Sequence, residues 1–274
     1  MVISLDLVFI LITNLGSELF LLITLPIIYF ARRKLGLRLS IMVLLGVWLT
    51  HVLKVLFRIE RPPKENWKVE ASGYSFPSGH ATNAATYWGY LAYRLRRTPA
   101  LSIVFLILVV LIGYSRVYLG VHRVEDIIGG FIVGTCTLIS VEYALNRAEK
   151  REFPIIGLII GSLIIPLLMI YVTYIIAGGF MEEVEVAIKT MSTLSGIAIG
   201  YIVASTKNLH LEDTKNISEV AKRSIIGLLI VMGLFLVHSA LEEITLVTFI
   251  TYWLMGVAIT LITPLIVRSI EKKS

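Results

Sequence analysis

Charged residues and cysteine are scarce in this sequence, and each scarcity excludes a class of protein. Only 16% of the 274 residues are charged, whereas 57% are hydrophobic and the mean hydropathy is +0.84. A typical soluble domain has about 25% charged residues. The single cysteine, Cys136, excludes an intramolecular disulfide and a metal site built from several thiolates. The composition is that of a membrane protein.

The apolar residues fall in runs long enough to cross a bilayer. A helix needs roughly 20 apolar residues to span a hydrocarbon core of about 30 Å. We expect an interfacial helix over residues 2–13 and an all-α, polytopic transmembrane helix bundle of about nine spans. The expected spans are 15–31, 39–57, 78–93, 101–119, 125–145, 154–177, 184–205, 225–240 and 244–267.

The basic residues predict the orientation of these spans. Most of the 25 Lys and Arg residues lie in alternate loops, which the positive-inside rule places in the cytoplasm. The N-terminus is then outside and the C-terminus cytoplasmic, and the net charge of +6 reflects these loops rather than a nucleic-acid partner. The first apolar stretch follows no basic segment and precedes no small-residue cleavage site, so we expect it to stay in the mature protein.

Three short motifs place charged and polar groups at the ends of apolar runs, all on the predicted outer side. They are Lys54-x6-Arg61-Pro62, Pro77-Ser78-Gly79-His80 and Ser115-Arg116-x5-His122-x3-Asp126. Each residue alone can be explained by an ordinary structural role, such as a snorkelling cation or a helix cap. The joint occurrence of three cations, two histidines and a carboxylate on one side favours chemistry on an anion.

The histidines and the carboxylate fit nucleophilic and acid–base roles. His122 and Asp126 are four residues apart and share one face of a helix. The carboxylate can hold one ring nitrogen of His122 and leave the other as a nucleophile. Ser78, Gly79 and His80 begin a helix, whose free N–H groups favour an anion.

The three cations suit a phosphoryl group. Phosphoryl transfer depends mainly on positioning and on neutralising the equatorial oxygens. Lys54, Arg61 and Arg116 supply that charge, and no spacing typical of metal ligands is present. We therefore expect neither a metal nor another cofactor.

These motifs resemble the three signatures of the type 2 phosphatidic acid phosphatase superfamily, over about residues 15–147. The resemblance implies that His122 attacks phosphorus to form a phosphohistidine and that Asp126 holds it. His80 would protonate the leaving group and then activate water. Lys54, Arg61, Arg116, Ser78 and Gly79 would bind the phosphate, and no metal would be required.

We expect residues 1–150 to form the phosphatase core and residues 151–274 to add transmembrane helices of unknown role. The expected function is hydrolysis of a lipid phosphate or diphosphate, such as a polyprenyl diphosphate, phosphatidic acid or phosphatidylglycerol phosphate, at the outer face of the plasma membrane. A sugar-phosphate phosphatase and a non-catalytic binder or transporter of lipid phosphates remain alternatives; a vanadium haloperoxidase is disfavoured.

Pairs of glycines four residues apart lie within three of the expected spans. They are Gly130/Gly134, Gly157/Gly161 and Gly196/Gly200. Such pairs allow close approach of helix backbones, within one chain or between two copies in a homodimer. We expect a packing role for them rather than a role in ligand binding.

Overall fold

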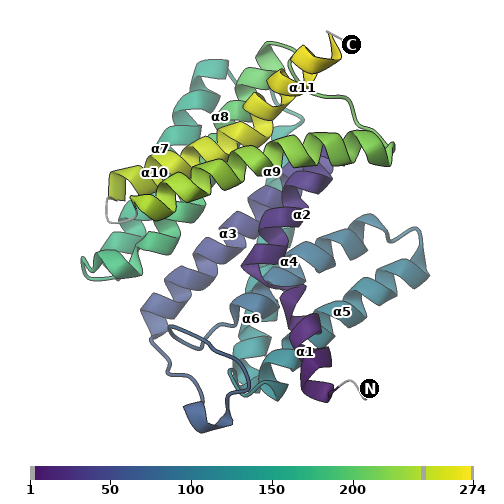
Figure 1. Cartoon of the computed structure of the whole chain (residues 1–274). Helices are drawn as coiled ribbons and strands as arrows, with labels where there is room; N and C mark the ends of the chain where they lie inside the picture. The colour runs from purple at the N-terminus through teal and green to yellow at the C-terminus, as the bar shows by residue number, and fades with distance from the viewer. Residues whose placement is uncertain (1–3, 242–244, 273–274) are drawn as a thin grey trace. The chain divides into compact units, whose positions relative to one another are not determined.

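The regular elements of the chain are all helical in the part that the structure describes. That structure is a computed structural model, and it describes residues 4–241 and 245–272. The helices are α1 (Leu5–Asn14), α2 (Glu18–Ala31), α3 (Arg33–Phe57), η1 (Lys64–Asn66), α4 (Gly79–Arg94), α5 (Pro99–Tyr118), α6 (Val124–Ala148), α7 (Ile155–Ile176), η2 (Met181–Glu183), α8 (Glu185–Thr206), α9 (Ile217–Ala240), α10 (Thr245–Val257), η3 (Ala258–Ile262) and α11 (Thr263–Glu271) (Figure 1). The all-α class is thus confirmed for these residues. Residues 2–3 of the expected interfacial helix and residue 244 of the last expected span lie outside them.

Seven of the described helices are long and apolar enough to cross a membrane: α3, α5, α6, α7, α8, α9 and the continuous helix formed by α10, η3 and α11. α1 and α2 meet at a bend of 47° and together add at most one span. The expected count of nine is not confirmed, because α4 has only 16 residues. At 1.5 Å per residue it is about 24 Å long, shorter than the hydrocarbon core.

The chain divides into two compact units, and the first contains all three motifs. Unit 1 comprises residues 1–22 and 42–147. α4 and α5 form an antiparallel hairpin in it (Figure 1), and α1 packs against α5. The α4 side chains from Ala81 to Tyr87 are buried. α4 is therefore the central helix of this unit, which explains why its sequence is rich in small and hydroxyl-bearing residues.

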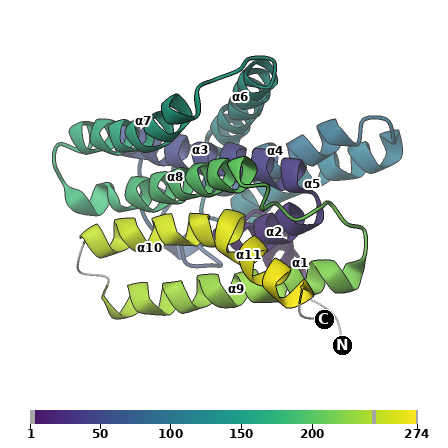
Figure 2. The same ribbon diagram turned by 90° about the horizontal axis from the view of Figure 1, so that it is seen from above.

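Unit 2 comprises residues 23–41 and 148–274, of which residues 242–244 and 273–274 are not described. α10 packs against both α8 and α9, and α7 packs against α8 (Figure 2). Most of α7 presents apolar side chains to the outside, including Ile156 and Ile165. The division that we expect at residue 150 stays a prediction, because unit 2 also takes in residues 23–41.

Two of the three glycine pairs lie where helices approach closely. A β-carbon on Gly130 would stand 2.6 Å from the carbonyl oxygen of Ser78, and one on Gly134 would stand 2.6 Å from that of Thr82. Gly196 packs against the Trp253 backbone of α10 in the same way. By contrast, a β-carbon on Gly161 would meet nothing closer than 3.9 Å. Gly130 and Gly134 therefore bring α6 against the first turns of α4.

We expect Gly130→Ala to destabilise the protein and Gly161→Ala to leave its stability unchanged or higher. The added methyl at Gly130 must displace α4, and overpacking of this kind costs about 1–3 kcal/mol. Thermal unfolding of the purified full-length protein in detergent measures both effects. Equal unfolding temperatures for the two variants would show that α6 and α4 do not need this close approach.

Candidate active site

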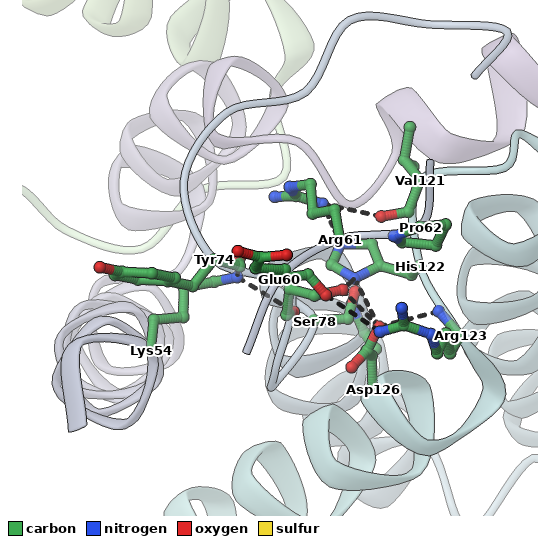
Figure 3. A network of polar contacts seen from close by, with 12 residues as sticks. Lys54, Glu60, Arg61, Pro62, Tyr74, Ser78, Val121, His122, Arg123 and Asp126 are labelled. Atoms are coloured by element: carbon green, nitrogen blue, oxygen red, sulfur yellow. Dashed lines mark hydrogen bonds and ion pairs between the residues drawn. The ribbon is translucent and has the colours of Figure 1, made fainter. Parts of the chain in front are cut away.

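His122 and Asp126 form a buried pair at the start of α6. The loop after α5 carries His122, and Asp126 lies in the first turn of α6. The imidazole Nδ1 lies 3.3 Å from Asp126 Oδ2, and Nε2 lies 3.0 Å from Arg61 Nη1 (Figure 3). The residues are 4% and 1% exposed, respectively. Because the carboxylate accepts from Nδ1–H, the lone pair is on Nε2, and that nitrogen can act as the nucleophile.

Ser75 completes this pair, and sequence reasoning missed it. Its hydroxyl lies 2.5 Å from Asp126 Oδ2 and 3.2 Å from His122 Nδ1, and the residue is fully buried. The hydroxyl therefore bridges both partners. The position three residues before Ser78, in the loop that leads into α4, was the signal available in the sequence. Serine is so common in loops that this signal does not single it out.

The cations Lys54 and Arg61 donate to backbone carbonyls of the loop before Ser78, and Arg61 also donates to one carbonyl of the loop after α5. The ammonium of Lys54, in the last turn of α3, donates to the carbonyls of Tyr74 and Ser75. The guanidinium of Arg61 donates to the carbonyls of Ser72, at 2.8 Å from Nη2, and Val121, at 2.9 Å from Nη1. Carbonyls are neutral acceptors, so these hydrogen bonds do not neutralise either cation, and the carboxylate that acts on both is Asp126.

Arg116 adds a third cation from the last turn of α5. It is 6% exposed, and its Nη1 donates to the hydroxyl of Thr13 at 3.2 Å. Its Nε has no hydrogen-bond partner among the described residues. A buried guanidinium with an unused donor is suited to an oxyanion.

The start of α4 supplies the remaining predicted residues. Ser78 caps the helix, accepting from the N–H of Ala81 at 3.5 Å, while its own N–H donates to the Asp126 carbonyl at 2.9 Å. A β-carbon on Gly79 would meet no atom within 4 Å, so there is open space beside this helix N-terminus. The imidazole of His80 makes no hydrogen bond to the described residues. It interacts electrostatically with four other residues of the site, which are Arg116, His122, Arg61 and Lys54.

The structure thus brings all eight predicted site residues together within unit 1. Arg61 lies outside the spans, and burial lowers the pKa of its guanidinium. Burial also lowers the pKa of His122 to about 4; its hydrogen bond to Asp126 opposes this shift, and nearby Arg61 adds to it. His122 is therefore neutral at pH 7. Three cations face one carboxylate, and the site is electrostatically suited to an anion.

No three His, Cys, Asp or Glu side chains come together as metal ligands would within residues 4–241 and 245–272. The acidic group nearest His122 is Asp126, which is already held by Ser75 and by the backbone N–H of Arg123 at 2.8 Å. The other titratable side chains that the motifs bring to the site are the three cations and His80. This set suits an oxyanion.

Comparison with known proteins agrees with the motifs. Residues 35–150 match the PAP2 superfamily, and residues 188–273 match a second family, the PAP2 superfamily phosphatase, transmembrane extension. The chain therefore belongs to the PAP2 superfamily, that of the type 2 phosphatidic acid phosphatases, and it is an integral membrane protein. The second match also gives the C-terminal half a relationship that sequence reasoning did not find.

Similar proteins include membrane phosphatases. Phosphatidylglycerophosphatase B of Bacillus subtilis is 40% identical over 45% of this chain and 66% of its own length. An undecaprenyl-diphosphatase of Sulfolobus acidocaldarius is 31% identical over 46% of this chain and 63% of its own length. The crystal structure of a transmembrane PAP2-type phosphatidylglycerolphosphate phosphatase from B. subtilis is 35% identical, with a TM-score of 0.48, over 54% of this chain and 78% of that one. The chain thus spans less than two thirds of some of these curated relatives.

The pKa of His122 predicts a pH dependence of stability. The pKa is about 4 in the folded protein and about 6.5 in an unfolded chain. Between these values the unfolded chain binds a proton that folded His122 does not, so stability falls as pH drops from 6.5 to 4. Above pH 6.5 His122 is neutral in the folded and in the unfolded chain, so its contribution to stability no longer changes with pH.

We expect the difference in unfolding temperature between wild type and His122→Asn to change over pH 4–6.5 and to stay constant over pH 7–8. Scanning calorimetry in one detergent measures it, and the comparison removes the titration of other groups. A constant difference across the whole range would mean that His122 titrates normally.

Proposed function

We propose that this protein is a phosphatase that hydrolyses a lipid phosphate or diphosphate through a phosphohistidine. The observation that carries the proposal is the geometry of His122. Its Nδ1 is held by Asp126 and Ser75, and its Nε2 points to Arg61 among the cations. Such an arrangement fixes one tautomer of the imidazole and directs the nucleophilic nitrogen to the place where a phosphate would bind.

In the first step, His122 Nε2 attacks phosphorus, and the bond from phosphorus to the leaving oxygen breaks. The leaving oxygen takes a proton from His80, whose ring makes no hydrogen bond to the described residues. Asp126 stabilises the positive charge that develops on the imidazole of His122. Arg61, Arg116 and Lys54 neutralise the equatorial oxygens, which requires Arg61 to exchange its contact with Nε2 for one with the phosphate.

In the second step, water attacks the phosphohistidine. His80 accepts a proton from the water, the N–P bond breaks, and inorganic phosphate leaves with the protons balanced. His122 returns to its neutral form with the proton on Nδ1. A general acid–base catalyst of this kind raises the reaction rate by about 10²–10⁴-fold. Neither step calls on a metal ion.

The substrate class is inferred from the position of the site and from the relatives. Lys54 and Arg116 lie in the last turns of apolar helices, which is headgroup depth for a lipid phosphate. Relatives include a phosphatidylglycerophosphatase and an undecaprenyl-diphosphatase. The distribution of basic loops supports an outward-facing site in the plasma membrane.

We expect purified protein to release phosphate from lipid substrates, and His122→Ala to abolish the release. Farnesyl diphosphate, phosphatidic acid and glucose 6-phosphate are compared in the presence of EDTA. Lipid turnover that EDTA leaves unchanged supports a metal-independent lipid phosphatase. Equal turnover of glucose 6-phosphate would favour a sugar phosphatase. No turnover by folded wild type would favour a binding or transport role.

The same proteins test the intermediate. If His80 activates water, His80→Ala slows the second step, and ³²P-labelled substrate leaves an acid-labile, alkali-stable label on the protein. His122→Ala and the double variant should carry no label. Labelling that persists without His122 would place the covalent bond on another residue.

Ser75→Ala should lower kcat by roughly 10–100-fold with little change in KM. The hydroxyl positions the His122–Asp126 pair without facing the substrate, and misplacement of a catalytic group by about 1 Å can cost about 10²-fold. Ser72→Ala is the matched control, because the Ser72 side chain is exposed and only its carbonyl contacts Arg61. A Ser75→Ala variant as active as Ser72→Ala would remove the positioning role.

A further inference from the structure

A second group of polar side chains lies in unit 2, away from the residues of the active site. We call it the Arg33 cluster, and its members come from α2, α3, α8, α11 and the segment between α8 and α9: Tyr29, Arg33, Tyr201, His210 and Arg268. Arg268 donates to the carbonyls of Asn208 and His210, each at 2.6 Å. The centroids of the Tyr201 and His210 rings are 4.7 Å apart.

Electrostatic interactions link the remaining members of the cluster to these residues. Tyr29 interacts electrostatically with both Tyr201 and Arg33. Burial lowers the pKa of His210 to about 4, and the charges of Arg33 and Arg268 lower it further. Two guanidinium charges therefore act on the same imidazole. No carboxylate is among the groups that shift this pKa.

Three polar atoms of the cluster are buried without a partner. Tyr29 Oη, Arg33 Nε and His210 Nδ1 make no hydrogen bond to any described residue. Tyr29 is only 4% exposed. Buried polar groups in folded proteins are nearly always satisfied, and an unsatisfied one calls for an explanation such as a bound ion or ligand. Tyr29 Oη and Arg33 Nε are hydrogen-bond donors, and together they indicate a ligand that accepts hydrogen bonds.

The charges of the cluster indicate that this ligand is an anion. Among the described residues, the side chain of Arg33 forms no hydrogen bond or ion pair; its backbone N–H donates to Asp213 Oδ1 at 3.0 Å. The Arg268 guanidinium is bound to carbonyls, which leave its charge uncompensated. The planar guanidinium of arginine matches the oxygens of a phosphate in pairs.

The position in the chain indicates a phosphate at membrane headgroup depth. Arg33 begins the apolar helix α3, and α8 ends at Thr206, just before the segment that carries His210. The members of the Arg33 cluster all belong to unit 2, and the active-site residues all belong to unit 1, so the two share no residue. Lipid headgroups are the phosphates most abundant at that depth.

We propose that Tyr29, Arg33 and Arg268 bind the phosphate of an anionic phospholipid that is retained as a structural or regulatory ligand and is not hydrolysed. The Tyr29 hydroxyl and the Arg33 guanidinium donate to the phosphate oxygens, and Arg268 adds a second positive charge. His210 is held beside them by its own hydrogen bond: the Ser205 hydroxyl donates to the Tyr201 carbonyl at 2.8 Å and therefore accepts from His210 Nε2–H at 2.7 Å. The proposal does not depend on phosphatase activity.

The test uses the delipidated full-length protein and phosphatidylglycerol, whose phosphodiester is not a phosphatase substrate. Native mass spectrometry counts retained lipid, and thermal unfolding gives the affinity. Phosphatidylglycerol should bind and raise the unfolding temperature, whereas zwitterionic phosphatidylcholine and inorganic phosphate should not. Arg33→Gln and Tyr29→Phe should each weaken binding at least tenfold. The exposed neighbour variant Arg32→Gln should stay within twofold of wild type.

The Tyr29→Phe variant is included because we expect it to fold like the wild type. It removes a buried hydroxyl that hydrogen-bonds to none of the described residues, so the lipid-free variant should unfold at the wild-type temperature or higher. Unchanged phosphatidylglycerol affinity in Tyr29→Phe and Arg33→Gln would overturn the proposal. Stabilisation by inorganic phosphate to the same extent would assign the site to a soluble anion and overturn its lipid part.

Discussion

The burial of the Asp126 carboxylate is the constraint on which the active-site half of the chain depends. The residue is 1% exposed, so its charge must be met by protein donors. Oδ2 receives them from three directions: the Ser75 hydroxyl, the Arg123 N–H and His122 Nδ1. The carbonyl of the same residue accepts from the Ser78 N–H. One residue at the start of α6 thus holds His122, the loop before α4 and the N-cap residue of α4.

The loop from Arg58 to Ser78 connects these parts without regular structure beyond η1. Its backbone is tied down at several points: Ser75 N–H donates to the Ile59 carbonyl at 2.7 Å, and Lys68 N–H to the Leu119 carbonyl at 3.0 Å. Its carbonyls in turn hold Lys54 and Arg61. The loop therefore positions the cations before any phosphate arrives, and preorganisation of this kind is what electrostatic catalysis requires.

What the sequence predicts about this site depends on the distance in the chain between the partners. His122 and Asp126 are four residues apart, so the sequence predicts their contact, although His122 lies in the loop just before α6 and not in the helix. The spacing of Gly130 and Gly134 likewise predicts a close helix approach, but only the structure shows that α4 is the partner. Ser75 lies 47 residues from His122, and only the folded chain shows that they meet. The count of nine spans is not confirmed for a similar reason: the small and hydroxyl-bearing side chains of α4 are buried within unit 1, and composition alone does not separate burial in protein from contact with lipid.

The two polar clusters follow one physical rule, which links the active site to the Arg33 cluster. In each, one arginine donates to backbone carbonyls and forms no ion pair with a carboxylate among the described residues: Arg61 uses Ser72 and Val121, and Arg268 uses Asn208 and His210. These hydrogen bonds hold the guanidinium group in place without neutralising its positive charge. If these guanidinium groups were paired with carboxylates, an incoming phosphate would have to break an ion pair. A buried carboxylate would then be left without a partner for its charge, which is costly. Carbonyl partners avoid this cost, because they hold the cation in place and leave its field available to an anion. An arginine that is held by neutral carbonyls keeps its charge for an anion, whereas an arginine in an internal salt bridge does not. This difference is what suits the two clusters of this apolar chain to a phosphate.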